Sequence, residues 1–215
     1  MASRYDTSTE AGREEGVAAA GRAVQRGRLV VVPTDTVYGI AADAFSPHAV
    51  ADLLAAKGRE RDMPVPVLVG SWRGLDGLAQ HMTPTMHRLV EAFWPGPLTL
   101  IVRASASLAW DLGQTRGTVA VRMPLHPVAL EVLAETGPLA VSSANRTGMP
   151  PATDAASAQE QLGDSVQVYL DAGSSGDPVA STIVDLTGDV PQVRRAGALS
   201  LEDLQAVLPD VEGPR

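Results

Sequence analysis

The sequence predicts an α/β protein built as a single domain. Short apolar runs typical of strands alternate along the chain with segments that carry helix-capping signals. The clearest strand is Leu29–Val32, four apolar residues in a row, as expected of a strand buried on both faces of a sheet. Two of the predicted strands end abruptly in polar side chains, at the point where open α/β sheets place their ligands.

Composition narrows the class of protein. The chain has 215 residues, 45% hydrophobic and 20% charged, which is typical of a soluble globular domain with a sizeable core. It contains no cysteine, which excludes disulfides and thiolate chemistry. Without a run long enough to span a bilayer or a signal-peptide core, we expect a cytoplasmic protein with no membrane partner. The net charge of −8 argues against nucleic-acid binding over the whole surface but permits a local basic pocket.

The first elements follow from local signals. Polar composition predicts a flexible N-terminus over residues 1–15. A helix with an Ala/Val face is expected over residues 17–26. Ser46 followed by Pro47 is the signature of an N-cap with proline at the first helical position, and it predicts a helix through about Ala56.

The rest of the chain continues the alternation. A strand over residues 65–69 is expected at a sheet edge, because Pro64 and Pro66 cannot donate to a ladder. We expect one catalytic domain over residues 16–208 and a C-terminal tail over residues 209–215. The remaining predicted elements are helices over 83–93, 127–135 and 154–162, a terminal helix capped by Ser200, and strands over 98–102, 118–122, 138–141, 166–171, 181–185 and 192–195.

Polar side chains follow two of these strands. The strand at 29–32 runs into PTDTVYG (33–39), and the strand at 138–141 runs into SSAN (142–145). One interpretation is that these side chains only satisfy the backbone of ordinary turns. Two such strand ends in one sheet also predict a shared polar pocket.

The basic residues of the chain are almost all arginine. Sixteen of the 17 are arginine, and Lys57 is the only lysine. It lies with Arg59 and Arg61 just past a predicted helix end, where the cations either complement the helix dipole in water or face an anionic ligand. We expect Lys57 on a solvent-accessible cavity wall. Alternation over the predicted strand puts Arg122 on the same face as Thr118, so Arg122 is either a surface cation or a charge aimed into the same site.

Several standard sites are absent from the sequence. It has no GxxxxGK[ST] phosphate loop, no GxGxxG fingerprint and no GxSxG elbow, and His81 and His87 lack metal-ligand spacing. What remains is hydroxyl, amide and cation chemistry, which fits electrostatic stabilisation of a pentavalent phosphate better than base catalysis by histidine. The candidate residues are Thr34, Lys57, Arg59, Ser143, Asn145, Ser181 and Arg195.

A series of blocks carries a family resemblance across about residues 17–200. In family order they are PTDTVYG (33–39), KGR (57–59), FWPGPLT (93–99), VAVRMP (119–124), SSAN with TG (142–148), STIVD (181–185) and RRAG (194–197). Together these blocks resemble the YrdC-type threonylcarbamoyl-AMP synthase family. The resemblance implies a single-domain open twisted sheet of parallel and antiparallel strands, with helices around it and a positively charged concave cavity.

The resemblance also implies an activity and its partners. The family condenses L-threonine, bicarbonate and ATP into threonylcarbamoyl-AMP and pyrophosphate, for N6-threonylcarbamoyladenosine formation in tRNA. Mg²⁺ is expected to arrive with ATP, without a dedicated protein metal site. Contact with tRNA and with downstream threonylcarbamoyl-transfer proteins is also expected.

The resemblance assigns roles to individual residues. Catalytic roles go to Lys57, Arg59, Ser143 and Asn145. L-threonine is expected against Thr34, Arg122, Ser142 and Ser181. ATP is expected against Lys57, Arg61, Thr118, the backbone at Ala144 and Ala152, and Arg195. The division suits the ligands, because threonine offers a carboxylate and a hydroxyl while ATP offers phosphates.

Some positions depart from the family pattern. After KGR the family often has Pro, two residues, then Lys/Asn-Pro-Leu, whereas this chain has ERDMPV, which weakens the assignment of Arg61. SSAN replaces the commoner TSAN and keeps the hydroxyl. The chain ends soon after RRAG, so we expect the short type without an extra C-terminal domain. Two alternatives stay open: a module that adenylates carbamoyl phosphate in larger carbamoyltransferases, and an RNA-binding module without catalysis.

Overall fold

The computed structural model describes residues 2–176 and 179–214. Its strands are β1 (Ser3–Asp6), β2 (Leu29–Val32), β3 (Gly39–Asp43), β4 (Val67–Leu68), β5 (Leu98–Arg103), β6 (Thr118–Arg122), β7 (Leu139–Ser143), β8 (Val166–Asp171), β9 (Thr182–Asp185) and β10 (Gln192–Arg195). Its helices are α1 (Glu10–Gln25), α2 (Pro47–Lys57), α3 (Arg73–Leu78), α4 (Pro84–Phe93), α5 (Pro127–Thr136), α6 (Ala155–Leu162) and α7 (Leu201–Val207), with a 3₁₀ turn η1 (Gly163–Ser165).

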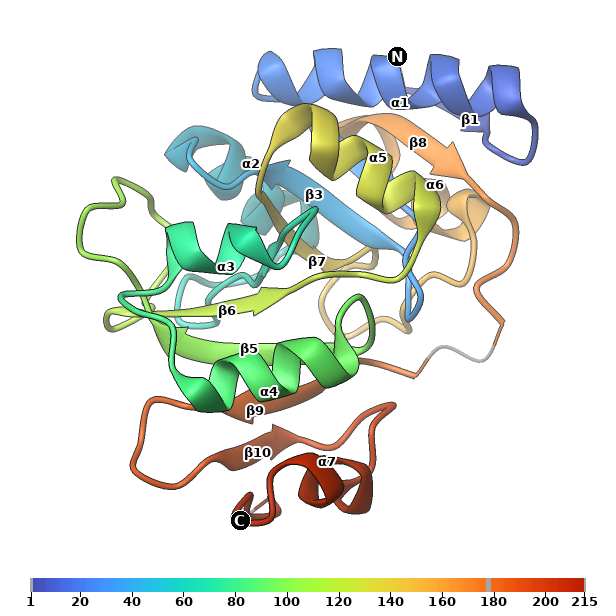
Figure 1. Ribbon diagram of the computed structural model, residues 1–215. Coiled ribbons are helices and arrows are strands. Elements are labelled where there is room, and N and C mark those ends of the chain that lie inside the picture. The colour runs from blue at the N-terminus through green and yellow to red at the C-terminus, as the bar shows by residue number, and fades with distance from the viewer. Residues whose placement is uncertain (1, 177–178, 215) are drawn as a thin grey trace.

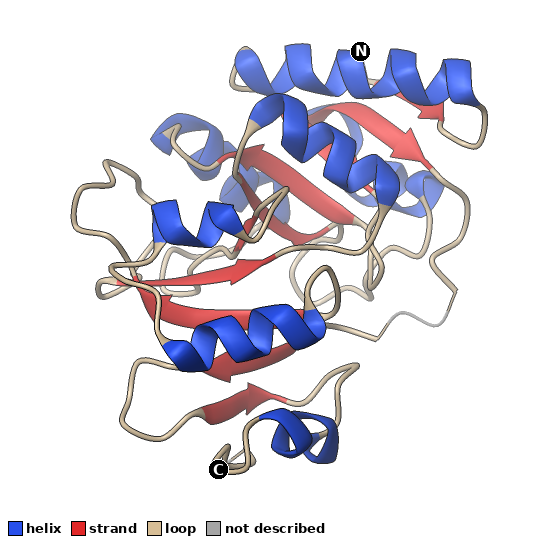
Figure 2. Cartoon of the chain, viewed as in Figure 1, coloured by secondary structure: helices blue, strands red, loops and turns tan. Residues whose placement is uncertain are grey.

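All of these strands belong to one ten-stranded sheet in the order β1-β8-β2-β3-β7-β4-β6-β5-β9-β10. Figure 1 shows the sequence of strands from β8 near the top to β10 near the bottom. The sheet is mixed, because β2 is parallel to β8 but antiparallel to β3, and β3 is antiparallel to β7. The predicted open, twisted α/β sheet is therefore confirmed, and Figure 2 shows the helices arranged around it.

Helices pack on both faces of the sheet. α1 and α5 lie side by side (Figure 1) and cover one face, where Val30 and Val168 are buried with Val24 and Val132 of the two helices. The other face packs against α2 and α4 in a larger core that includes Leu53. Burial of these apolar side chains is the main stabilising contribution to the fold.

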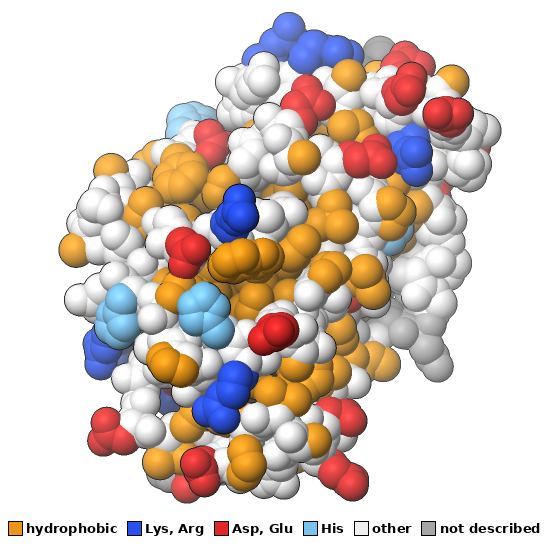
Figure 3. All heavy atoms as spheres, in the orientation of Figure 1, with side chains coloured by type: hydrophobic (Ala, Val, Ile, Leu, Met, Phe, Trp, Pro, Cys, Tyr) orange, Lys and Arg blue, Asp and Glu red, His pale blue; other side chains and the backbone are white. Residues whose placement is uncertain are grey.

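Capping signals place α2 and α7 where the sequence predicts them, whereas α1 begins at Glu10, earlier than the predicted residue 17. Ser46 accepts a hydrogen bond from the amide of Ala49, and Pro47 is the first residue of α2. Ser200 caps α7 in the same way through the amide of Asp203. In the part of the chain that the structure describes, no helix combines the length and apolar character needed to cross a bilayer. Figure 3 shows acidic and basic side chains interspersed on one face of the molecule, with apolar side chains between them.

The N-terminal segment differs from the prediction of a flexible arm over residues 1–15. Within the described residues, Ser3–Asp6 forms β1 in parallel with β8, and Thr9 caps α1 through the amide of Gly12. That prediction is wrong because an edge strand is held by main-chain bonds to its neighbour, which polar composition does not reveal.

The strand predicted at a sheet edge over residues 65–69 is also wrong in its position. β4 contains only Val67 and Leu68, and it lies inside the sheet between β7 and β6. Pro66 precedes the strand and contributes only its carbonyl, which accepts a hydrogen bond of 2.8 Å from the amide of Val141. The missing proline N–H is therefore not needed at this place.

Other differences concern short segments. The sequence patterns do not predict β3, which follows directly on a turn, or α3, a six-residue helix with two glycines. The described part of the expected C-terminal tail, residues 209–214, packs against the rest of the fold. Val211 is buried, and the carbonyl of Glu212 accepts a 2.9 Å hydrogen bond from the amide of Val193 in β10.

Candidate active site

One face of the sheet is covered in one half and hollowed in the other. Residues paired across a ladder share a face, so Val141 lies with Ala41 of β3, and Leu68 lies with Arg122 of β6. Val141 and Leu68 belong to the core beneath α1 and α5, and they also line a cavity of about 450 Å³. The cavity therefore continues the covered face over β6, β5 and β9.

The cavity wall carries most of the predicted site. Among the described residues of the wall are three arginines and no carboxylate. The positive charge expected of the cavity stays a prediction, and this composition favours it. The predicted residues on the wall are Thr34, Arg59, Thr118, Arg122, Ser142, Ser143, Ser181 and Arg195.

The two polar strand ends meet at this cavity. β2 and β7 are both antiparallel to β3, so they run in the same direction and end at the same edge of the sheet. Thr34 and Thr36 after β2 and Ser142 and Ser143 in β7 line one cavity, which confirms the predicted shared pocket. Thr34 also serves its own turn, because its hydroxyl donates to the carbonyl of Val37 at 2.6 Å. The polar side chains after β2 therefore satisfy the backbone of their own turn and also line the shared pocket.

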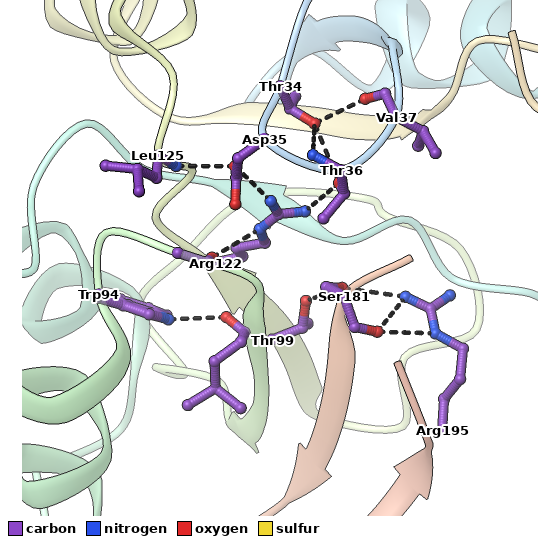
Figure 4. Close-up of polar contacts among 12 residues, drawn as sticks. Thr34, Asp35, Thr36, Val37, Trp94, Thr99, Arg122, Leu125, Ser181 and Arg195 are labelled. Atoms are coloured by element: carbon purple, nitrogen blue, oxygen red, sulfur yellow. Dashed lines mark hydrogen bonds and ion pairs between the residues drawn. The ribbon is translucent and has the colours of Figure 1, made fainter. Parts of the chain in front are cut away.

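Arg122 is a fixed, buried cation and not a surface cation. Its Nε donates to the carbonyl of Gly96 at 3.0 Å, Nη1 donates to Oγ1 of Thr36 at 2.8 Å, and Nη2 donates to Oδ1 of Asp35 at 2.5 Å (Figure 4). The amide of Leu125 holds the same carboxylate oxygen at 2.8 Å. Burial lowers the pKa of Arg122, and the Asp35 carboxylate opposes that shift. Of the five N–H groups of a guanidinium, two are left for a ligand.

A second polar group forms where β5 meets the start of β9. Oγ of Ser181 lies 2.8 Å from Oγ1 of Thr99, and Figure 4 shows Ser181 between Thr99 and the Arg195 guanidinium. Arg195 donates to the carbonyl of Ser181 from Nε at 3.0 Å and from Nη2 at 2.8 Å. Nη2 also donates to the Ser181 hydroxyl at 3.0 Å. The contacts orient Arg195 along the cavity wall.

Arg59 connects the KGR block to SSAN. Its Nη1 donates to Oγ of Ser142 at 3.0 Å, while Nε and Nη2 donate to the carbonyls of Met63 and Pro64. Burial is the main cause that lowers the pKa of Arg59. Its guanidinium therefore lies between the wall of the cavity and the segment that departs from the family pattern.

Lys57 is not on the cavity wall, and the prediction that it would be is wrong. The residue is only 4% exposed, at the last position of α2. Its Nζ donates to the carbonyl oxygens of Ser143 at 2.5 Å and Asn145 at 2.6 Å, and lies 3.5 Å from Oδ1 of Asn145. The ammonium faces main-chain oxygens rather than the cavity because the SSAN turn lies over the end of α2. Burial and then the nearby Arg59 lower the pKa of Lys57 to about 8.

Four other predicted residues also lie off the wall. Asn145 is buried and donates from Nδ2 to the carbonyls of Arg146 and Met149. Ala144 and Ala152 are buried, and the amide of Ala144 donates to the carbonyl of Tyr38 at 2.7 Å. Arg61 is half exposed, and its Nη2 contacts both carboxylate oxygens of Asp111 at 2.6 Å.

Three residues of the site receive no role from sequence reasoning, although Asp35 and Thr36 are among the polar side chains that follow the strand at 29–32. Asp35 and Thr36 hold Arg122, and Thr99 holds Ser181. All three lie within the quoted family blocks, so the blocks mark them without giving a role. A threonine inside the apolar run LTLIV is the local signal that could have drawn attention to Thr99.

Comparisons with known proteins agree with this geometry. A family model named Sua5_yciO_yrdC and described as telomere recombination matches residues 22–197. A Mycobacterium tuberculosis protein provisionally named a threonylcarbamoyl-AMP synthase is 56% identical over 208 residues, covering 97% of this chain and 96% of that protein. A threonylcarbamoyl-AMP synthase of Pyrococcus abyssi is 36% identical over 189 residues, covering 87% of this chain and 56% of that protein. The crystal structure of P. abyssi Sua5 complexed with L-threonine matches with a TM-score of 0.91 at 34% identity, over 99% of this chain and 62% of that chain.

Proposed function

The chain belongs to the Sua5/YciO/YrdC family, and we propose on that premise that it is a threonylcarbamoyl-AMP synthase. It condenses L-threonine, bicarbonate and ATP into threonylcarbamoyl-AMP and pyrophosphate, for the threonylcarbamoyl modification of tRNA. The observation that carries the proposal is the cavity, whose described wall combines arginines and hydroxyl groups without a carboxylate. Such a wall suits ligands that bring their own negative charge.

L-threonine occupies the part of the cavity around Arg122. Thr34, Arg122, Ser142 and Ser181 line it, which supports the assignment made by resemblance. The two free N–H groups of Arg122 suit a carboxylate, and short hydroxyl side chains suit the hydroxyl of the substrate. The Asp35 contact keeps the guanidinium from rotating away, so the site is pre-organised.

ATP occupies the part around Thr118 and Arg195, which also line the cavity. Arg59 is the further wall cation available to phosphate oxygens. Direct contacts of ATP with Lys57, Arg61, Ala144 and Ala152 stay predictions from the resemblance. Mg²⁺ would arrive with ATP and would help to neutralise the charge of the phosphates, and the described wall has no carboxylate that would hold the ion by itself.

The chemistry follows from the product. The threonine amine forms a bond to the carbon of bicarbonate, and the C–OH bond of bicarbonate breaks, so that water leaves with a proton of the amine and a carbamate remains. A carbamate oxygen then attacks the α-phosphorus of ATP, and the bond to pyrophosphate breaks as pyrophosphate leaves. The guanidinium groups of the wall stabilise the negative charge on the phosphoryl oxygens in the transition state. Ser143 binds and does not attack, since no described His, Asp or Glu lines the cavity to activate it as a base.

The test is incubation with ATP, Mg²⁺ and bicarbonate plus each amino acid in turn, with pyrophosphate release as the readout. We expect release that requires both threonine and bicarbonate. Equal turnover with carbamoyl phosphate in place of threonine and bicarbonate would instead indicate the carbamoyltransferase alternative. Absence of turnover together with tight, salt-sensitive tRNA binding would indicate the RNA-binding alternative.

The proposal includes a cytoplasmic location and transfer of the product to downstream threonylcarbamoyl-transfer proteins. The net charge of −8 and the mixed charges on the face in Figure 3 argue against broad RNA affinity as the main activity. Contact with tRNA therefore stays a secondary part of the proposal. Fluorescent tagging in cells and co-purification with transfer proteins are the measurements that check these points.

A further inference from the structure

We propose that Thr99 is a positioning residue for substrate specificity, which makes the Ser181 hydroxyl a hydrogen-bond donor to the side-chain hydroxyl of L-threonine. Both residues line the cavity. Thr99 acts through Ser181 and does not itself contact the substrate. The inference rests on the proposed function and deepens it, because it concerns which group of the substrate that same site recognises.

Strand pairing places Thr99 beside Ser181. β5 and β9 are parallel neighbours in the sheet, and their ladder pairs Leu98 with Thr182. Thr99 and Ser181 each adjoin this pair, and their hydroxyl oxygens lie 2.8 Å apart. The two residues are only 3% and 5% exposed. The contact between the two hydroxyl groups is therefore fixed by the main chain and is largely shielded from solvent.

The two hydroxyl groups have one proton more than they can use between themselves. Each hydroxyl has one proton and two lone pairs, and the single contact between the two oxygens holds only one proton. Among the described residues, the Thr99 hydroxyl has no other partner, and the Ser181 hydroxyl has only Nη2 of Arg195, which is a donor. One buried O–H donor is therefore left for an acceptor in the cavity, because leaving it unpaired costs free energy.

Arg195 favours the arrangement in which Ser181 offers this donor. Nη2 of Arg195 donates to the Ser181 oxygen at 3.0 Å and so occupies one of its lone pairs. When Thr99 donates to the second lone pair, Ser181 can only donate, and Figure 4 shows Ser181 between these two neighbours. Hydrogen bonds in a chain polarise one another, so the bond from a cation makes the Ser181 O–H a stronger donor. Ser181 then binds an oxygen acceptor and rejects a donor such as an ammonium group.

The acceptor is the side-chain hydroxyl of L-threonine. The other oxygen acceptor of threonine is its carboxylate, which the two free N–H groups of Arg122 suit, since its other three donors are held by the protein. A site built to hydrogen-bond a substrate hydroxyl rejects an analogue that lacks it, because a buried polar group is then left unpaired. Thr99 therefore governs discrimination between threonine and an amino acid of the same shape without the hydroxyl.

The experiment measures the binding of three amino acids by isothermal titration. L-2-Aminobutyrate has the shape of threonine without the hydroxyl, and L-serine has the hydroxyl without the methyl group. Thr99→Val keeps the shape of the side chain and removes its hydroxyl, whereas Thr99→Ser keeps the hydroxyl. The control is Thr136→Val, because the Thr136 hydroxyl donates to the carbonyl of Val132 within α5 and the residue does not line the described cavity wall.

We expect the wild type to bind threonine more tightly than L-2-aminobutyrate. Thr99→Val should bind threonine and serine about three- to tenfold more weakly, and L-2-aminobutyrate within about twofold of the wild type. Thr99→Ser and the control should bind all three as the wild type does. In a Ser181→Ala background, Thr99→Val should have no further effect on threonine binding, because Thr99 acts through Ser181.

The ratio of the threonine and L-2-aminobutyrate affinities is measured within one variant, so partial unfolding of that variant does not change it. If Thr99→Val does not fold, Thr99→Ala takes its place in the same comparison. An unchanged ratio in the folded variant would overturn the inference, because the contact would then be to a group that both ligands share. Full additivity of Thr99→Val and Ser181→Ala would overturn it too. If the wild type binds none of the three amino acids, the proposed function fails instead.

Discussion

Two halves of one sheet face show how a single scaffold makes both a core and a binding site. Over β8, β2, β3 and β7, the face lies under α1 and α5, and its side chains are apolar, as at Val168, Val30 and Leu139. Over β6, β5 and β9, the same face borders the cavity and carries polar side chains such as Thr99 and Thr118. The backbone register continues from one half to the other through β7, β4 and β6.

The two halves differ in the partners that their buried side chains have. In the covered half, helices supply apolar partners, so burial alone stabilises the face. In the open half, polar groups hold one another, as Asp35 holds Arg122 and Thr99 holds Ser181. These contacts use only part of the hydrogen-bonding capacity of each group, and the remainder is available to a ligand. The open half is therefore stabilised enough to keep its shape and still able to bind.

The largest effect should follow removal of the carboxylate beside Arg122. Asp35→Ala leaves a buried guanidinium without its partner, which costs about 3–5 kcal/mol of unfolding free energy. The matched control is Asp111→Ala, because the Arg61–Asp111 distance of 2.6 Å resembles the 2.5 Å of Arg122–Asp35 while its side chains are 52% and 40% exposed. Urea unfolding should show a large loss for the first variant and no measurable change for the second. Equal losses would mean that burial does not distinguish the two pairs.

Truncation of one apolar residue in each half compares the halves directly. Leu139→Ala removes a side chain that is 1% exposed under the helices, and should cost about 3 kcal/mol. Ile101→Ala only widens a cavity that Ile101 already lines, and should cost about 1 kcal/mol. The measurement is the unfolding free energy from urea titration of both variants. A larger loss for Ile101→Ala would contradict the division into a packed and an open half.

A smaller effect should appear in the pH dependence of stability at Lys57, which lies at the border of the open half. Its pKa is lowered to about 8 by burial and by Arg59, against about 10.5 in the unfolded chain. Above pH 8 the unfolded state therefore binds more protons than the folded state, so stability rises with pH until about 10.5. Relative to Lys57→Met, the wild type should gain about 1 kcal/mol between about pH 7.5 and pH 9. Parallel stability curves would show that the ammonium is not buried as described.

The smallest effect should come from Ser143→Ala. Ser143 lines the cavity as a binding group, and a net hydrogen bond of about 0.5–1 kcal/mol corresponds to a loss of about two- to fivefold in kcat/KM. Steady-state pyrophosphate release gives this ratio, and mass spectrometry of the enzyme after turnover should show no adduct. A covalent adduct at Ser143, or abolished turnover in a folded variant, would assign it a nucleophilic role.

Local signals in the sequence predict much of the fold. The N-cap at Ser46 and the apolar run of β2 act over a few residues, and the structure confirms both. β1 and β4 depend on partners far away in the chain, since β1 pairs with β8 and β4 lies between β7 and β6. Polar edge residues in the first case and prolines in the second gave misleading local signals.

The residues of the site also fall into two groups, those that local sequence signals predict and those whose position depends on contacts far away in the chain. Strand ends and family blocks predict that Thr34 and Ser142 share a pocket, because strand direction alone brings them to one edge. The orientation of Lys57 could not be predicted, since it depends on where the SSAN turn lies relative to α2. The partnership of Asp35 with Arg122 likewise joins residues far apart in the chain. The motifs thus identify which residues belong to the site, and tertiary packing determines which of these residues face the cavity.

The most direct test of the open half as the substrate site is hydrogen–deuterium exchange with and without L-threonine, ATP and Mg²⁺. The two turns at the cavity edge, residues 33–38 and 142–147, should exchange more slowly when the ligands are bound. α1 and β8 in the covered half should exchange as in the free protein. Protection concentrated in α1 or β8, with the two turns unchanged, would contradict the assignment of the open half to substrate binding.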